Sequence, residues 1–447
     1  MAISNDAASS SAASSASSSD GAHAGHTPES VYRKVTLRVV PLILICYFIG
    51  YLDRVNVGFA KLQMMSDLAL TETAYGVGAG LFFIGYLLLQ VPAGFLVKRI
   101  GIRACLVGSM LSWGIVSIAT LLTRDQTTFY AFRFLLGLTE ASFFPAVIAY
   151  FGVWFPSFRL SKVMSYLFLA MPLGVIIGAP LSGWIMDITH GSHGLAGWQW
   201  MFLIEGLPAV VLAVVLFNVV TDQVAGARWL SPAEVSLIQG EIARESADKK
   251  TALLPALKEP TLWLLFTISF LYNIGNYGLV FWLPSMVKAL GTLTNFQTGL
   301  ISAIPYLVAA VAMVLNAQHS VKSRERRWHT AIPVFVGGVA LLASVAIHGA
   351  PAVAIGCLTI GVAGIMCTLA MFWSLPSRIL AGTAAAGGAG LVNVGAAVAG
   401  FVGPSVMGFL AQSTGSTTTG VGLLAIALFL AGALILTIPR RYLKAGT

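Results

Sequence analysis

The chain has 447 residues, of which 57% are hydrophobic and 10% are charged, with a formal net charge of +9 and a mean hydropathy of +0.84. Soluble domains carry about 25% charged residues, so an ordinary soluble domain, a disordered chain, a collagen and a disulfide-built secreted scaffold are all excluded. A polytopic membrane protein remains. Without a polar head of roughly 35 residues and a polar middle of roughly 40, about 370 residues remain, and at roughly 20 per span plus a short loop they predict about twelve membrane-spanning helices.

The chain begins with a polar segment, residues 1–32, that is rich in serine and alanine. It cannot bury enough apolar surface to fold, so we expect a disordered cytoplasmic tail. It is not a secretory signal, because no hydrophobic region follows a basic start.

Twelve apolar segments follow and predict an all-α membrane protein built from two pseudo-symmetric six-helix bundles. The expected bundles cover residues 33–220 and 259–439, and residues 440–447 form a short cytoplasmic tail. The predicted spans are 38–60, 75–97, 104–123, 129–153, 162–186, 199–220, 260–287, 297–317, 330–348, 352–374, 383–411 and 419–438.

A longer polar linker, residues 221–258, separates the two predicted bundles. Within it Ser231, Pro232 and Glu234 occupy the N-cap, N1 and N3 positions of a short helix. Most lysines and arginines, of which Arg33 is the first and Lys444 the last, lie in segments on one side of the predicted membrane topology. By the positive-inside rule, that side, with both termini and the linker, is cytoplasmic. The positive net charge therefore reports topology and does not indicate nucleic-acid binding.

Asp53 and Arg54 lie deep in the first predicted span, and Arg133 and Glu140 lie in the fourth. Each costs about 2.5–3.5 kcal/mol at mid-bilayer if it faces lipid, so they must face a polar interior. Buried ion pairs that only fix helix packing are one interpretation, but such pairs seldom add net stability. Arg133, Gly137 and Glu140 are spaced i, i+4, i+7 and share a helix face.

The second half holds no acidic residue within its apolar spans and offers neutral polar and aromatic groups instead. Asn273, Asn276 and Tyr277 share one helix face at i, i+3 and i+4. Trp373 and Ser374 follow in the tenth span and Asn393 in the eleventh. This asymmetry predicts a pocket in which cationic groups of the first half hold an anion and nearby acids carry a proton.

Several motifs resemble the anion:cation symporter family of the major facilitator superfamily. They are Tyr51 to Ala60 (YLDRVNVGFA), Arg133 to Gly137 (RFLLG), Glu140-Ala141, Phe144-Pro145, Trp154 to Pro156, Gly197 to Trp200, Glu205 to Pro208, Phe281 to Pro284 and Phe372 to Pro376. The resemblance extends from about residue 33 to residue 440 and is specific when the motifs are taken together.

The resemblance implies a proton-coupled symporter that imports a small organic anion by alternating access. The Asp-Arg-Val-Asn sequence is similar to that of tartrate, phthalate and hydroxyphenylacetate permeases, so a hydroxy-dicarboxylate or an aromatic acid is the implied substrate. Arg54 and Arg133 would bind its carboxylate, and Asp53 and Glu140 would couple protons. The implied pocket-lining residues are Tyr51, Tyr86, Tyr277, Trp373, Ser374 and Asn393.

We also expect a monomer in the bacterial inner membrane that is driven by the proton gradient and has no cofactor and no metal. Three positions depart from the family pattern. Lys98 and Val321 stand where family members carry acids in the loops after spans two and eight, and Ala397 stands where span eleven often has asparagine.

Two other functions are considered. Proton-antiport efflux of a drug or cation shares the fold, but two buried arginines disfavour a cationic cargo. A membrane-embedded enzyme is disfavoured because the sequence has no H-E-x-x-H, no G-x-S-x-G and no metal-spaced cluster.

Overall fold

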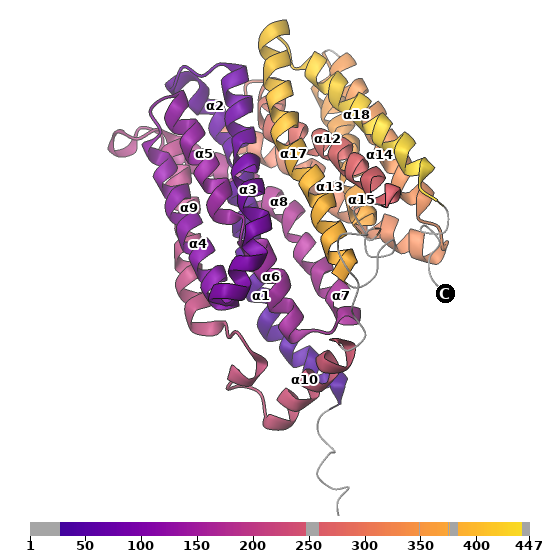
Figure 1. Cartoon of the computed structure of the whole chain (residues 1–447). Coiled ribbons are helices and arrows are strands. Elements are labelled where there is room, and N and C mark those ends of the chain that lie inside the picture. Colours follow the sequence, from indigo (N-terminus) through magenta and orange to yellow (C-terminus); the bar gives the residue numbers. More distant parts are fainter. Residues whose placement is uncertain (1–26, 247–258, 348, 374, 376–382, 440–447) are drawn as a thin grey trace, which may run out of the picture.

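The computed structural model describes residues 27–246, 259–347, 349–373, 375 and 383–439, and these are helical apart from short turns. Figure 1 shows two groups of helices side by side, one indigo to magenta and the other orange to yellow. The first group contains α1 (Pro28–Val55), α2 (Val57–Asp67), α3 (Glu72–Ile100), α4 (Ile102–Ala119), α5 (Gln126–Glu140), α6 (Phe143–Trp154), α7 (Ser157–Phe168), α8 (Ala170–Thr189) and α9 (Gly197–Val219).

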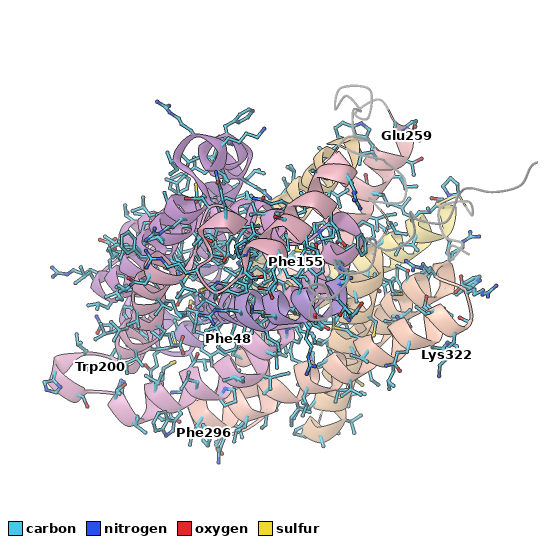
Figure 2. The ribbon with its side chains drawn as sticks, turned by 90° about the horizontal axis from the view of Figure 1, so that it is seen from below. Phe48, Phe155, Trp200, Glu259, Phe296 and Lys322 are labelled. Atoms are coloured by element: carbon cyan, nitrogen blue, oxygen red, sulfur yellow. The ribbon has the colours of Figure 1, made fainter. Side chains whose placement is uncertain are left out.

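The second group contains α12 (Pro260–Lys288), α13 (Asn295–Lys322), α14 (Arg327–Ala346), α15 (Pro351–Phe372), α17 (Thr383–Thr414) and α18 (Thr418–Thr437). Seen from below, side chains fill the space between the helices of both groups (Figure 2). Within the described residues, twelve helical segments are long and apolar enough to cross a membrane. The predicted all-α architecture with twelve spans is therefore confirmed.

Three spans consist of two consecutive helices, and the breaks have local causes. The fourth span breaks between α5 and α6, and the fifth breaks at Leu169 between α7 and α8. Pro145 and Pro172 follow these breaks within the first turn of the next helix. Proline lacks an N–H donor and clashes with the carbonyl four residues earlier, which interrupts the helix at that point. In the first span, Asn56 separates α1 from α2.

The first helix starts earlier than we predicted, at Pro28, because the sequence supplies a complete start signal. The side chain of Thr27 accepts a hydrogen bond from the backbone N–H of Ser30 at 3.3 Å, and proline occupies the first turn. Residues 28–32 are thus helical and do not belong to a disordered tail. The remainder of that predicted tail, residues 1–26, and the C-terminal tail, 440–447, lie outside the described residues.

The predicted linker helix is present as α10 (Pro232–Ser246). The backbone N–H of Ser231 donates to the Glu234 carboxylate at 2.8 Å, and the Ser231 hydroxyl accepts from the Glu234 N–H at 3.3 Å. These reciprocal bonds form a capping box. Glu234 also pairs with Lys34 at 2.9 Å. This pair attaches α10 to the start of α1, and Figure 1 shows the two helices close together there.

The two halves meet along α3 with α17 and along α8 with α13. We call the end of the molecule opposite to α10 in Figure 1 the outer end. There the Tyr75 hydroxyl donates a hydrogen bond to the carbonyl of Phe281 at 3.2 Å. Asp187, near the end of α8, accepts from the N–H groups of Asn295 and Phe296 at 3.2 and 2.8 Å. A carboxylate at a helix N-terminus is a favourable arrangement, so this contact fastens α13 to the first half.

Gly137 permits the closest approach between α3 and α5. A Cβ atom at this position would lie 1.8 Å from the Phe82 carbonyl oxygen, so the backbone of α3 fills the space beside Gly137. Gly137→Ala is expected to lower the free energy of unfolding by about 1–3 kcal/mol, because the overpacked helices α3 and α5 must move apart. The melting temperature in detergent tests this. Gly152→Ala in α6, where no atom lies within 4 Å, is the control and should melt like the parent.

Candidate functional site

A central cavity lies between the two halves, and Arg54 is the single charged residue among its described lining residues. The first half contributes side chains from α1, α3, α6, α7 and α8, and the second contributes side chains from α12, α15 and α17. The lining residues are Tyr47, Arg54, Phe83, Tyr86, Phe144, Phe168, Met171, Asn273, Tyr277, Leu369, Trp373, Asn393, Ala396 and Ala397. One cation in an aromatic wall favours an anionic ligand with apolar parts.

Arg54 is held by an ion pair with Glu140 of α5. Its guanidinium also lies over the rings of Phe82 and Tyr86, at 5.0 and 5.4 Å from their centroids. Aromatic faces attract guanidinium groups, which lowers the cost of burying this cation. The Nε of Arg54 and the Oε2 of Glu140 are buried without a hydrogen-bond partner. The pair therefore keeps unused donor and acceptor positions for a ligand or a proton.

Arg133 does not reach the cavity wall, contrary to the expectation that it faces a ligand there. Its side chain is 1% exposed and packs over the Phe82 ring at 5.3 Å, where one nitrogen donates to the Ala79 carbonyl at 3.4 Å. The reason is that α3 lies across its helix face. Its Nε and Nη1 have no partner, so this arginine is a buried cation with unused donors.

Asp53 is separated from the Arg54–Glu140 pair, because consecutive residues point about 100° apart on a helix. Its carboxylate is 1% exposed and accepts hydrogen bonds from Trp113 Nε1 at 2.6 Å and from Ser117 Oγ at 3.0 Å, both on α4. Asp53 is thus fixed by two neutral donors and does not line the cavity.

The second half places most of its predicted residues on the cavity wall. Asn273, Tyr277, Trp373 and Asn393 line it. Asn273 is oriented by a hydrogen bond to the Ser269 carbonyl at 2.8 Å. Asn276 is buried but is not among the residues that line the cavity, and it is turned about 100° around α12 from Tyr277, which does line it. Ser374 lies outside the described residues.

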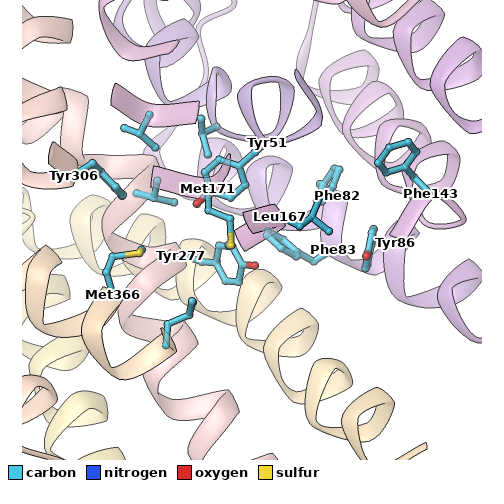
Figure 3. Close-up of a cluster of buried hydrophobic side chains, with 14 of the residues drawn as sticks. Tyr51, Phe82, Phe83, Tyr86, Phe143, Leu167, Met171, Tyr277, Tyr306 and Met366 are labelled. Atoms are coloured by element: carbon cyan, nitrogen blue, oxygen red, sulfur yellow. The ribbon is translucent and has the colours of Figure 1, made fainter. Parts of the chain in front are cut away.

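Aromatic residues join the two halves across this cavity. The Tyr277 ring packs against Phe83 with centroids 4.4 Å apart, and Figure 3 shows Tyr277 beside Phe83 and Met171. Trp373 stacks on Phe168 with centroids 6.3 Å apart. Tyr86 lines the wall as expected, whereas Tyr51 does not, because it is packed against Gly174 of α8.

Several residues of this region were not predicted from the sequence. Tyr47 lines the cavity two helical turns before Arg54, a spacing of seven that was available as a signal. Glu205 is a further buried carboxylate, in the middle of the apolar helix α9. Lys61 is a buried lysine that pairs with Glu72 at 2.6 Å and lies over Trp282 of the second half.

Comparisons with known proteins agree with this architecture. The family model described as Major Facilitator Superfamily matches residues 43–404. An Agrobacterium vitis protein named "Putative tartrate transporter" is 41% identical over 418 residues, 92% of this chain and 95% of that protein. A "Quinolone resistance transporter" of Acinetobacter baumannii is 34% identical over 404 residues, covering 90% and 93%.

Among solved structures, the crystal structure of a D-xylose-proton symporter superposes with a TM-score of 0.73 at 15% identity. The match covers 91% of this chain and 98% of the symporter, and at that identity it shows the fold alone. The proteins of the matched superfamily and the two relatives are transporters and not enzymes. This chain therefore belongs to the Major Facilitator Superfamily and is a multi-pass membrane transporter.

Proposed function

We propose that this transporter imports a small organic carboxylate together with protons by alternating access. The observation that supports it best is that Arg54 is the single charge among the described cavity-lining residues and is shared with Glu140. An arginine fork is suited to bidentate binding of a carboxylate. The remaining wall offers aromatic faces and the Asn273 and Asn393 amides, which suit a hydroxy-dicarboxylate or an aromatic acid.

The coupling follows from competition for Arg54. While Glu140 is ionised it occupies the guanidinium, and an incoming carboxylate must displace it. A displaced carboxylate in a dry cavity would lack a counter-ion, which is costly. Glu140 therefore takes a proton as the anion binds Arg54, and charge in the cavity is conserved. On release, Glu140 loses the proton and returns to Arg54. Asp53 is proposed as a second coupling group behind the wall.

Alternating access then requires the two halves to rock around this cavity. The hydrogen bonds of Tyr75 and Asp187 hold the outer end together, so the arrangement described here corresponds to a carrier closed on that side. We place α10 and both termini in the cytoplasm of a bacterium, with the chain acting as a monomer in the inner membrane and drawing energy from the proton gradient without a cofactor. Ala397 lines the cavity, so this departure from the family pattern bears on substrate choice.

Uptake by reconstituted protein tests the proposal. Proteoliposomes with an alkaline interior are given labelled tartrate, phthalate or hydroxyphenylacetate, and an ionophore that collapses the gradient provides the control. We expect accumulation of at least one of these anions, abolished by the ionophore. Absence of gradient-driven accumulation for every carboxylate tried would overturn the proposal.

Proton-antiport efflux is the second candidate, and similarity to the protein named for quinolone resistance is the observation that favours it. The same vesicles distinguish the two functions. With an acidic interior, an antiporter accumulates a quinolone, whereas a carboxylate symporter expels its anion. Arg54, the single charged residue among the described lining residues, disfavours efflux of a cationic drug, because such a drug would meet another cation there.

A further inference from the structure

Glu205 forms a second buried polar centre that the proposed carboxylate site does not use. It is 2% exposed and is the single ionisable residue of α9. Its Oε1 accepts a hydrogen bond from the Ser182 hydroxyl of α8 at 2.7 Å. Its Oε2 accepts from the Asn56 amide at 3.0 Å. Both partners are neutral, so the structure supplies hydrogen bonds to this carboxylate but no counter-charge.

The charged residues on the neighbouring helices are engaged elsewhere. On α2, Lys61 pairs with Glu72 and Asp67 accepts from Trp198. On α8, Asp187 caps α13. On α4, the guanidinium of Arg103 donates to the Phe217 carbonyl.

On α1, Asp53 stands one helical turn before Asn56 and is bound by Trp113 and Ser117, while Arg54 pairs with Glu140. Two buried carboxyls, Asp53 and Glu205, are therefore linked through one turn of α1, and the basic residue of that turn, Arg54, pairs with Glu140 and with neither of them.

The partners of Glu205 are able to serve either protonation state. The Ser182 hydroxyl both donates and accepts. The Asn56 amide offers a donor at one end and an acceptor at the other, and its Oδ1 is buried without a partner. A half-turn of the amide brings Oδ1 to Glu205, where it accepts a hydrogen bond from a protonated carboxyl. The unused Oδ1 is therefore the acceptor that a protonated Glu205 requires.

This centre also lies at the junction of the two halves. Asn56 and Ser182 line a small internal cavity whose opposite wall, from α12 and α13, includes Pro284, Ser302 and Tyr306. The Ser302 hydroxyl is 1% exposed and has no partner. Asn56 also marks the break between α1 and α2. Movement of the halves against each other therefore changes the surroundings of the two residues that hold Glu205.

We infer that Glu205, held by Asn56 and Ser182, is a proton-binding site of this transporter, separate from the Arg54–Glu140 pair. A proton adds to one oxygen of the ionised carboxylate and leaves again to water, with no other bond made or broken. Its use in driving uptake rests on the proposed symport, but the presence of the proton does not.

Infrared difference spectroscopy tests this inference on the purified full-length protein in lipid. The carbonyl stretch of protonated carboxyls is followed during an acid-to-alkaline titration of the parent, E205Q, E140Q and D53N. We expect one titrating band that the parent, E140Q and D53N share and that E205Q lacks. Glutamine suits the site because its amide can bond to both Asn56 and Ser182.

A titration of E205Q that matches the parent band for band would overturn the inference and leave Glu205 a packing residue. S182A provides a second measurement if E205Q fails to fold. It keeps the carboxyl and removes one hydrogen bond, so the midpoint of the same band should change, and an unchanged midpoint for every band would contradict the assignment. If the band is lost in E205Q but transport by the parent does not respond to the proton gradient, the proposed symport is refuted and the proton site at Glu205 stands.

Discussion

Arg54→Ala is expected to abolish substrate binding, since it removes the one charged group among the described residues of the cavity wall. Truncating one partner of a buried, hydrogen-bonded charge pair costs about 2–5 kcal/mol, and at about 1.4 kcal/mol per tenfold change the dissociation constant rises at least about 30-fold. Isothermal titration of the purified protein with the transported carboxylate measures this. An unchanged dissociation constant would remove Arg54 from the binding site.

Two further variants separate binding from folding in this experiment. Arg54→Ala leaves Glu140 buried without its cation, which by itself destabilises the protein. The double variant Arg54→Met with Glu140→Gln removes both charges and should fold, yet should still fail to bind. Arg54→Lys keeps a positive charge but loses the planar fork, so an affinity between those of the parent and Arg54→Ala is expected.

Glu140→Gln is expected to uncouple anion movement from protons. Glutamine keeps an acceptor oxygen near Arg54 but cannot take up a proton or compete as an anion. Exchange of labelled for unlabelled substrate across vesicles should therefore persist. Accumulation driven by a proton gradient should be lost, so that inside and outside concentrations become equal when the membrane potential is clamped.

The pH dependence of anion binding by Glu140→Gln is a second measurement of the role of Glu140. In the parent, binding weakens toward alkaline pH because ionised Glu140 competes for Arg54. In Glu140→Gln this dependence should flatten. Retained uphill accumulation by the variant would show that another group carries the coupling proton. Gln126→Glu, at the exposed start of α5, is a control that changes a charge on the same helix and should leave coupling intact.

The spans were predictable from sequence because a membrane imposes length and apolarity on every helix. The partners of buried charges were not predictable in the same way. The spacing of Arg133 and Glu140 placed both on one face of a helix, but Glu140 is paired with Arg54 of another helix. Spacing along a helix fixes a direction, whereas a partner depends on which neighbour packs there, and α3 covers Arg133.

Glu205 illustrates a different limit. An acidic residue in the middle of an apolar span was a signal in its own right, but no second charge accompanies it in α9. Its partners, Asn56 and Ser182, lie on α1 and α8 and are polar residues of an ordinary kind. Only the packing of three helices brings them together. The second-half wall was easier to predict, since Asn273 and Tyr277 are one turn apart.

Arg54 is the one charged residue among the described residues of the cavity wall, which has an electrical consequence for transport. A monocarboxylate that enters with one proton moves no net charge, so the membrane potential neither helps nor hinders it. A dianion that enters with one proton carries one negative charge inward. A membrane potential that is negative inside opposes this movement, at a free-energy cost of about 2.3 kcal/mol per 100 mV. A second proton cancels that term. The voltage dependence of uptake in vesicles therefore counts the protons that accompany each anion.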